Sequence, residues 1–277
     1  MRMSILNYAI PPILQLETTT ACNLACPFCL RAELCGSDEY LSFDAFRQII
    51  DGTRCRFVTL HGWGEPLMNQ DLPRMVRYAA GHRKSVNFTT NATLIHEKVD
   101  ALLASGLDAI AFSLPDIDRC TPIIAENISR FVAERAKRGQ KKPETCINIA
   151  IMEENLDQLD RMLAMVRDFG VDTVVFERSF PWTDSLQKKE SDMFQGIRDT
   201  AGQFGLKVKF PPDHTSPCPL MRYTLFVRWN GDVAPCCYRA NVAIGNINSD
   251  SMVRIMQNRA RFLKSQRSDP VCNSCRV

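Results

Sequence analysis

The sequence predicts an α/β protein, in which an open, partial (β/α)6 barrel is followed by a small C-terminal domain made of a hairpin and a helix. Short apolar runs alternate with longer stretches of helical periodicity up to about residue 176, a pattern typical of βα units around a parallel sheet. Beyond that point the alternation stops and cysteines accumulate. We therefore expect a barrel over residues 1–180, and a linker with a cysteine-rich domain over residues 181–277.

The predicted barrel contains alternating strands and helices. Strands are expected at residues 13–16, 57–61, 86–90, 108–113, 146–151 and 173–176. Helices are expected at residues 43–50, 72–80, 97–104, 122–137 and 156–169. An open parallel sheet binds its ligand at the carboxyl ends of its strands, so the functional residues should follow the strands.

The remainder of the chain has a different pattern. Residues 179–186 are polar and interrupted by Pro181, a helix is expected at 192–204, and residues 206–210 alternate like a strand. Asn230-Gly231 is a hairpin-turn sequence between predicted strands at 223–229 and 232–234, and a further helix is expected at 250–262. These elements should form the C-terminal domain.

Composition limits the class of protein. The net charge of +3 over 277 residues is too small to indicate nucleic-acid binding, and no apolar run is long enough to cross a membrane. The N-terminus lacks the features of a signal peptide, so we expect a cytoplasmic protein. In such a protein, twelve cysteines favour metal binding or catalysis over disulfides.

Three cysteines follow the first predicted strand within eight residues. Cys22, Cys26 and Cys29 have the spacing CxxxCxxC, with Phe28 just before the last cysteine. Three thiolates can hold a 4Fe-4S cluster while leaving one iron without a protein ligand, which suggests catalysis. The alternative is a zinc site, but the CxxxCxxC spacing with an aromatic residue just before the last cysteine is unusual for zinc.

Polar residues follow the next three predicted strands. His61 precedes a glycine-rich turn containing Gly62, Gly64, Glu65 and Pro66, in which the backbone can approach a ligand and Glu65 offers a carboxylate suited to an ammonium group. We interpret His61 as a packed strand-end residue. Asn91 and Ser113 end the third and fourth strands, where such residues either contact a ligand or cap the next element.

A second group of cysteines surrounds the predicted hairpin. Cys218, one of the adjacent pair Cys236 and Cys237, Cys272 and Cys275 offer four ligands for one buried cluster. We favour Cys236 over Cys237, although their adjacency leaves that choice open. The alternative is a structural zinc site with four cysteines.

These motifs resemble those of radical S-adenosylmethionine (radical SAM) enzymes, with a C-terminal auxiliary-cluster domain of the SPASM or shorter Twitch type. The resemblance rests on the cysteine trio with Phe28, on residues 62–66 in place of a Gly-Gly-Glu-Pro motif, and on the C-terminal cysteines with the hairpin. Trp63 stands where that motif has a glycine, directly ahead of Gly64-Glu65-Pro66. The resemblance implies two 4Fe-4S clusters and S-adenosylmethionine. The residues that would contact S-adenosylmethionine are Phe28, Gly62, Gly64, Glu65, Pro66, Asn91 and Ser113.

The resemblance further implies reductive cleavage of S-adenosylmethionine and hydrogen abstraction from a substrate carbon. We expect a two-electron oxidation of a sugar-like or aminocyclitol-like small molecule, with an external reductant such as flavodoxin or ferredoxin. Cys237 or Cys35 could instead return a hydrogen atom, which would make the enzyme an epimerase. A peptide maturase remains an alternative, although few residues precede the first strand. A non-catalytic iron-sulfur electron carrier is an alternative of another class.

Overall fold

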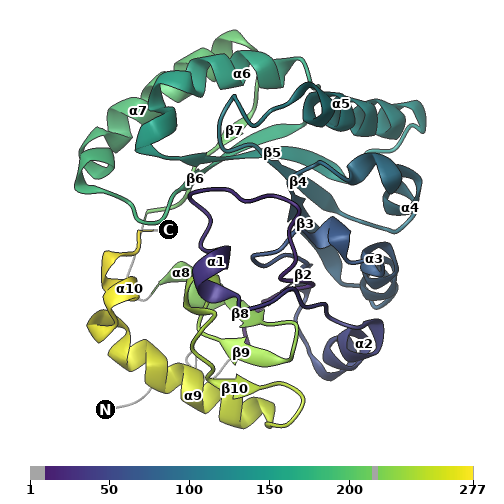
Figure 1. Cartoon of the computed structure of the whole chain (residues 1–277), viewed down its shortest axis with the longest axis vertical. Coiled ribbons are helices and arrows are strands. Elements are labelled where there is room, and N and C mark those ends of the chain that lie inside the picture. Colours follow the sequence, from purple (N-terminus) through teal and green to yellow (C-terminus); the bar gives the residue numbers. More distant parts are fainter. Residues whose placement is uncertain (1–9, 214–217, 277) are drawn as a thin grey trace. The chain divides into compact units, whose positions relative to one another are not determined.

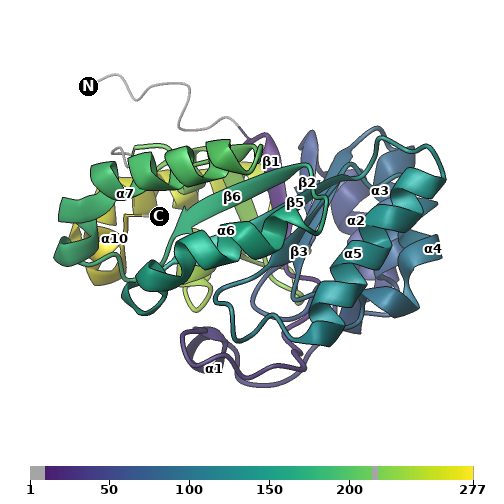
Figure 2. The same cartoon turned by 90° about the horizontal axis from the view of Figure 1, so that it is seen from above.

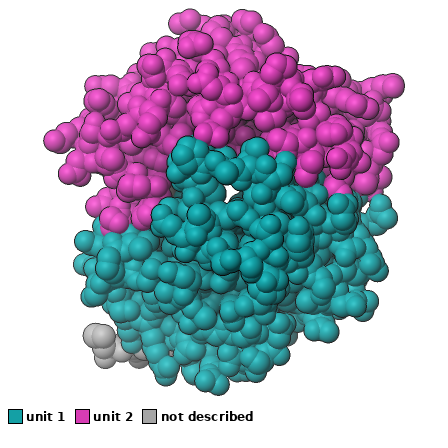
Figure 3. Space-filling model, in the orientation of Figure 1, with its two compact units in different colours: residues 1–88, 105–107, 215–273 teal, residues 89–104, 108–214, 274–277 magenta. Residues whose placement is uncertain are grey.

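The computed structural model describes residues 10–213 and 218–276. They form two compact units (Figure 3). Unit 1 comprises Met1–Phe88, Ser105–Leu107 and Thr215–Asn273, and unit 2 comprises Thr89–Ala104, Asp108–His214 and Ser274–Val277. None of the helices described is long and apolar enough to cross a bilayer. The domain boundary expected near residue 180 stays a prediction.

Unit 1 is built around β1 (Ile13–Leu16), where Leu14 and Leu16 are fully buried. β1 pairs in parallel with β2 and with β8, whereas β9 pairs antiparallel with β8 and β10. The strands in spatial order are β10 (Gly245–Asn246), β9 (Asp232–Ala234), β8 (Thr224–Val227), β1, β2 (Phe57–Thr59) and β3 (Ser85–Thr90), the last of which ends in unit 2. The C-terminal hairpin is therefore part of the same sheet as the first strand (Figure 1).

Three helices of unit 1, Phe43–Gly52, Leu72–Gly81 and Met252–Ser265, bury apolar side chains in its core. α2 begins after Ser42, whose hydroxyl accepts a hydrogen bond from the Ala45 N–H, and it buries Phe46, Ile49 and Ile50. The helical segments are α1 (Arg31–Leu34), α2 (Phe43–Gly52), η2 (Pro66–Met68), α3 (Leu72–Gly81), α8 (Pro219–Tyr223), η5 (Cys237–Arg239), α9 (Met252–Ser265), η6 (Gln266–Ser268) and α10 (Pro270–Ser274), the last of which ends in unit 2.

Unit 2 contains four parallel strands in the order β4, β5, β6 and β7. Their bounds are β4 (Ala109–Ser113), β5 (Glu144–Ile151), β6 (Thr173–Arg178) and β7 (Val208–Lys209). The helical segments are η3 (Ile95–Glu97), α4 (Val99–Leu103), α5 (Pro122–Lys137), η4 (Glu153–Gln158), α6 (Leu159–Arg167) and α7 (Asp184–Gln203). α5, α6 and α7 lie along one side of these strands, as the two ribbon views show (Figures 1 and 2).

The predicted α/β fold with a parallel sheet is confirmed, and all six predicted barrel strands are present. The expected end of the sheet at the sixth strand is wrong, because β7 continues it in parallel. The helix expected at 192–204 begins earlier, at Asp184. Thr183 caps it by accepting a hydrogen bond from the Leu186 N–H at 3.2 Å, and Pro181 lies ahead of this cap, where it does not interrupt the helix.

Several other boundaries also differ from the predictions. The strand expected at 223–229 is confined to β8, because Pro219 starts the short helix α8 that extends to Tyr223. The helix expected at 156–169 is divided into the 3-10 segment η4 and the helix α6. The helix expected at 97–104 is shorter, and the one expected at 250–262 runs from Met252 to Ser265 after its cap Ser251.

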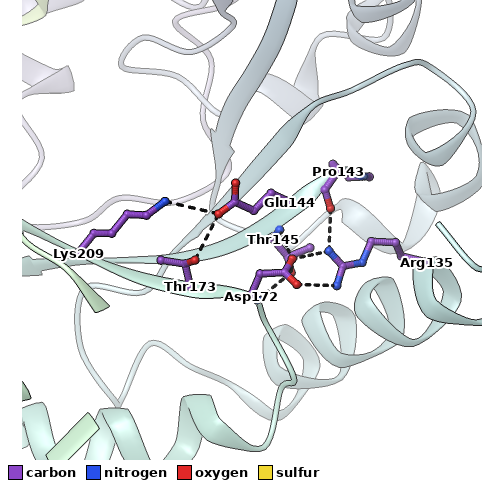
Figure 4. A network of polar contacts seen from close by, with 7 residues as sticks. All are labelled: Arg135, Pro143, Glu144, Thr145, Asp172, Thr173 and Lys209. Atoms are coloured by element: carbon purple, nitrogen blue, oxygen red, sulfur yellow. Dashed lines mark hydrogen bonds and ion pairs between the residues drawn. The ribbon is translucent and has the colours of Figure 1, made fainter. Parts of the chain in front are cut away.

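A polar network joins helix α5 to strands β5 and β6 in unit 2 (Figure 4). The Arg135 guanidinium forms an ion pair with Asp172, and its Nη1 also donates to the Pro143 carbonyl at 2.8 Å. Asp172 accepts further hydrogen bonds of 2.8 Å from the amide and the hydroxyl of Thr145. Burial opposes ionisation of Asp172, but the bonds from Arg135 and Thr145 prevail and lower its pKa.

We predict that Asp172→Asn destabilises the protein at neutral pH by about 1–3 kcal/mol, because charge-assisted hydrogen bonds are lost. A carboxylate with a lowered native pKa stabilises the fold above its ordinary pKa of about 3.9, and this stabilisation is lost as the pH falls through the native value. Anaerobic urea unfolding followed by circular dichroism at several pH values measures the effect.

The matched control is Asp157→Asn, at an exposed position of η4. It should change the free energy of unfolding by less than about 0.5 kcal/mol. An equal loss of stability in Asp172→Asn at neutral and at acidic pH would contradict the electrostatic explanation.

Candidate active site

The cysteine trio lies on the loop that follows β1. Cys22, Cys26 and Cys29 are all half-buried, and the Cys29 N–H donates to the Cys26 carbonyl at 3.0 Å. Arg31 holds the loop by hydrogen bonds to the Thr20 carbonyl and to the Asp38 carboxylate. This loop thus has defined anchors on both sides of the three thiols.

The glycine-rich turn packs directly against this cysteine loop. The Glu65 N–H donates to the Ala21 carbonyl at 2.8 Å, next to Cys22 in the sequence. Burial raises the pKa of Cys22, and the Glu65 carboxylate and the Cys26 thiol act in the same direction. The turn that carries the predicted carboxylate therefore contacts the loop that carries the predicted cluster ligands.

The two glycines of the turn are required by this close packing. A Cβ atom at Gly62 would lie 2.6 Å from the Glu17 Cγ, and one at Gly64 would lie 2.6 Å from the Ala21 carbonyl oxygen and closer still to that of Thr19. Neither glycine has a positive φ. The glycines therefore allow the turn to approach the backbone that leads to Cys22.

The Glu65 side chain is almost fully buried and has a structural role as well. One carboxylate oxygen accepts a hydrogen bond of 3.0 Å from the Leu67 N–H and caps η2, which begins at Pro66. His61 ahead of the turn is held neutral, because burial lowers its pKa to about 4.

Sequence analysis missed Glu17, which is fully buried directly after β1. Its carboxylate pairs with the Arg228 guanidinium at 3.4 Å and accepts the Trp63 N–H at 3.4 Å. Burial raises the pKa of Glu17, against the opposing effect of Arg228. An acidic residue directly after an apolar strand could have drawn attention to Glu17. Its partner Arg228, however, lies in the C-terminal part of the chain, far from the predicted barrel.

The C-terminal cysteines occupy the hairpin and the final helix. Cys218 is buried ahead of α8, and Cys236 follows β9. Burial raises the pKa of Cys236 well above its ordinary value, and the thiols of Cys237 and Cys218 add to the shift. Cys272 lies in α10, and Cys275 follows that helix.

An ion pair connects two of the cysteine segments of unit 1. Arg239, which ends η5, pairs with Asp269 at 2.9 Å. Asp269 also accepts hydrogen bonds from the amides of Val271 and Cys272 at 3.0 and 3.1 Å. The segment after Cys236 is thereby attached to the start of the helix that carries Cys272.

Within residues 10–213 and 218–276, no three Cys, His, Asp or Glu side chains converge as a metal-ion site. The fit to iron-sulfur clusters rests on donor chemistry: three thiols on one short loop, with two of them interacting, and a second set in which Cys218 and Cys236 interact. The residues present fit both groups.

In unit 2, the predicted residues Asn91 and Ser113 lie at strand ends. The Asn91 Oδ1 accepts hydrogen bonds from the amide and the hydroxyl of Thr93 at 3.0 and 2.6 Å, so this residue shapes the turn after β3. Ser113 is exposed and pairs in register with Asn148.

Asn148 and Glu177, which sequence analysis also missed, share a hydrogen bond of 3.3 Å between β5 and β6. Glu177 is solvent-exposed, and desolvation raises its pKa. The sequence marks both residues only as polar positions among apolar ones in a strand. The alternation of the strand does not show which face of the sheet they lie on.

Comparison with known proteins identifies the family. Residues 16–166, more than half of the chain, match the sequence model of the radical SAM superfamily. The chain belongs to the radical SAM superfamily. Residues 218–276 match SPASM, an iron-sulfur cluster-binding domain. As a radical SAM enzyme with this domain, the protein uses 4Fe-4S clusters and S-adenosylmethionine.

Several relatives of this radical SAM enzyme have named functions. It is 23% identical to the tungsten-containing aldehyde ferredoxin oxidoreductase cofactor-modifying protein of Pyrococcus furiosus, over 95% of this chain and 86% of that protein. It is 32% identical to GTP 3′,8-cyclase of Chlorobaculum tepidum over 61% of this chain, and 30% identical to mycofactocin maturase MftC of Mycolicibacterium smegmatis over 70%. The matches span 54% and 50% of those two proteins, about half their length.

Solved radical SAM structures share the fold. SuiB of Streptococcus suis bound to S-adenosylmethionine matches with a TM-score of 0.68 and 16% identity, over 95% of this chain and 67% of SuiB. The structure of anSMEcpe with bound AdoMet matches with a TM-score of 0.70 and 13% identity, over 91% of this chain and 82% of anSMEcpe. The structure of BtrN in complex with AdoMet and 2-DOIA matches with a TM-score of 0.54 and 16% identity, over 96% of this chain and 92% of BtrN. At these identities the likeness concerns the fold alone.

We predict that Gly64→Ala lowers the iron content and destabilises the protein by about 1–3 kcal/mol, because an added methyl group has no room beside the Thr19 and Ala21 carbonyls. Iron analysis after anaerobic reconstitution and urea unfolding measure both effects. Gly81→Ala is the matched control, since nothing lies within 4 Å of its added Cβ. Equal behaviour of the two variants would contradict the packing argument.

Proposed function

We propose that this radical SAM enzyme oxidises a hydroxyl-bearing small molecule, such as a sugar or an aminocyclitol, by two electrons. The observation that carries this proposal is the presence of two thiol sets. One is the set of three cysteines on the loop that the Glu65 turn contacts, and the other consists of four of the five cysteines in the SPASM segment. When bound, the first cluster and S-adenosylmethionine supply a 5′-deoxyadenosyl radical that takes a hydrogen atom from a substrate carbon. Flavodoxin or ferredoxin is our candidate reductant for that step.

Individual residues receive roles under this proposal. Cys22, Cys26 and Cys29 hold the first cluster, and the Glu65 carboxylate receives the ammonium group of S-adenosylmethionine. Residues 62–66 with Phe28, Asn91 and Ser113 line the cofactor site. Cys218, Cys236, Cys272 and Cys275 hold the auxiliary cluster.

Oxidation requires that the substrate also loses one more electron and one proton. The four-cysteine site offers an acceptor for the electron. Glu177 offers an acceptor for the proton, because a carboxylate with a raised pKa is a better base at neutral pH than an ordinary one. Asn148 orients it through the hydrogen bond between the two side chains.

Two alternatives have support of their own. MftC and PqqA peptide cyclase, at 30% and 27–30% identity, favour modification of a peptide, although the chain spans only about half of their length. Matches over most of both proteins include those to the Pyrococcus protein and to BtrN, which favour a small molecule or a cofactor. They also include the match to anSMEcpe, which was solved with a bound peptide. An epimerase would need a hydrogen donor, and the Cys35 thiol fits in one respect, because burial raises its pKa to about 11 and keeps it protonated.

We predict about eight irons per chain after anaerobic reconstitution, because two 4Fe-4S clusters are expected. Replacing Cys22, Cys26 and Cys29 together by Ala should leave about four, and so should replacing Cys272 and Cys275. Iron and sulfide analysis with electron paramagnetic resonance (EPR) counts the clusters. About four irons with one zinc in the native chain would contradict an auxiliary iron-sulfur cluster.

We predict that the reduced protein cleaves S-adenosylmethionine to 5′-deoxyadenosine, and that the triple Cys→Ala variant does not. With a substrate found by screening hydroxyl-bearing small molecules, the product should be lighter by two hydrogens in mass spectrometry. In deuterium oxide, an isomeric product carrying one deuterium, abolished by Cys35→Ala or Cys237→Ala, would show epimerisation instead.

A further inference from the structure

Trp63 occupies the one position at which the glycine-rich turn departs from the radical SAM motif. Its indole Nε1–H donates to the Cys237 carbonyl at 2.9 Å. Its ring meets the Tyr238 ring edge-on, with centroids 5.8 Å apart and planes at 78°. The residue is partly buried against the cluster formed by Phe226, Ala234 and Ala240, together with Cys237. A glycine at this position could make none of these side-chain contacts.

The main chain of Trp63 is fixed independently of its ring. Its N–H donates to the Glu17 carboxylate at 3.4 Å, and Arg228 of the hairpin pairs with the same carboxylate. Gly62 ahead of it packs against Glu17 without room for a side chain. The indole therefore extends from a firmly held turn, and its contacts constrain the segment that it touches.

That segment carries the proposed auxiliary ligand. Cys237 is bonded to Cys236, and the Cys237 carbonyl that accepts the indole hydrogen bond belongs to the first residue of η5. On the other side, Trp63 is separated from Glu65 by one residue. Trp63 thus belongs to the turn proposed to bind S-adenosylmethionine, and its side chain contacts the peptide that positions Cys236.

Resting on the proposed function, we propose that Trp63 is a positioning residue that couples the two cofactor sites. Assembly of the auxiliary cluster orders the Cys236–Tyr238 segment, the indole transmits that order to residues 62–66, and S-adenosylmethionine then binds more tightly. A merely structural tryptophan would stabilise both segments without making one site respond to the other.

A double-mutant cycle tests this coupling. The four proteins are the native chain, Trp63→Gly, the pair Cys272→Ala with Cys275→Ala, and the combination of all three changes. Each is reconstituted anaerobically, and the dissociation constant of S-adenosylmethionine is measured by equilibrium dialysis. EPR of the first cluster with and without S-adenosylmethionine confirms that this site is loaded in every protein.

We expect removal of the auxiliary cluster to weaken S-adenosylmethionine binding about five-fold or more in the native background and less than about two-fold in the Trp63→Gly background. Equal weakening in both backgrounds would overturn the coupling. If the native chain, with its first cluster loaded, bound no S-adenosylmethionine, the proposed function itself would fail, which is a distinct result.

Trp63→Phe serves if the glycine variant does not fold, because it keeps a smaller aromatic ring at this position while it removes the indole N–H. We expect it to shift the midpoint potential of the auxiliary cluster, since the Cys237 peptide loses its hydrogen bond. Trp182→Phe is the matched control: Trp182 is buried in unit 2, and its indole nitrogen has no hydrogen-bond partner among the described residues. Identical potentials in the two Phe variants would contradict the proposal.

Discussion

The buried carboxylate of Glu17 is the interaction on which the arrangement of unit 1 depends. Removing a carboxylate from water is costly, and this cost must be offset by fixed partners. Arg228 supplies the opposite charge, and the Trp63 amide supplies a hydrogen bond. Because these partners come from the C-terminal hairpin and the glycine-rich turn, one desolvated charge holds three distant parts of the chain around the end of β1.

The parallel pairing of β1 with β8 has a consequence for the cysteines. It places the hairpin that leads to Cys236 in the same sheet as the strand that leads to Cys22. Both cysteine segments therefore start from strands of one sheet, β1 and β9, which are separated by β8 alone, rather than from separately folded domains. The Arg239–Asp269 pair extends this order to the helix that carries Cys272.

Membership of the superfamily does not by itself specify a substrate. The superfamily shares the cofactor chemistry, and its members carry names as different as GTP 3′,8-cyclase and mycofactocin maturase. A shared fold with different substrates is expected when the fold supplies the reactive group and a few side chains supply recognition. Asn148 and Glu177, which share a hydrogen bond between β5 and β6, are the side chains to which our proposal assigns the substrate proton.

The sequence by itself determined the features whose residues are close neighbours along the chain. The three cysteines lie within eight residues, and the helix Pro122–Lys137 is specified by its cap Thr121, its first proline and its apolar period. The order of strands and helices was readable for the same reason. These local patterns were sufficient to predict both the α/β fold and the chemistry of the first cluster.

Only the tertiary structure decided how distant segments meet. Glu17 and Arg228 are 211 residues apart, and Trp63 and Cys237 are 174 apart, so no local period indicates either contact. Pro181 suggested that no helix begins before residue 192. In the structure Thr183 caps a helix that begins at Asp184, because its hydroxyl accepts a hydrogen bond from the Leu186 N–H. The physical reason is the same in each case. A buried charge, an indole N–H or a helix end needs a hydrogen-bond or ion-pair partner, and that partner is the group that folding brings close. The sequence alone does not show which group this is.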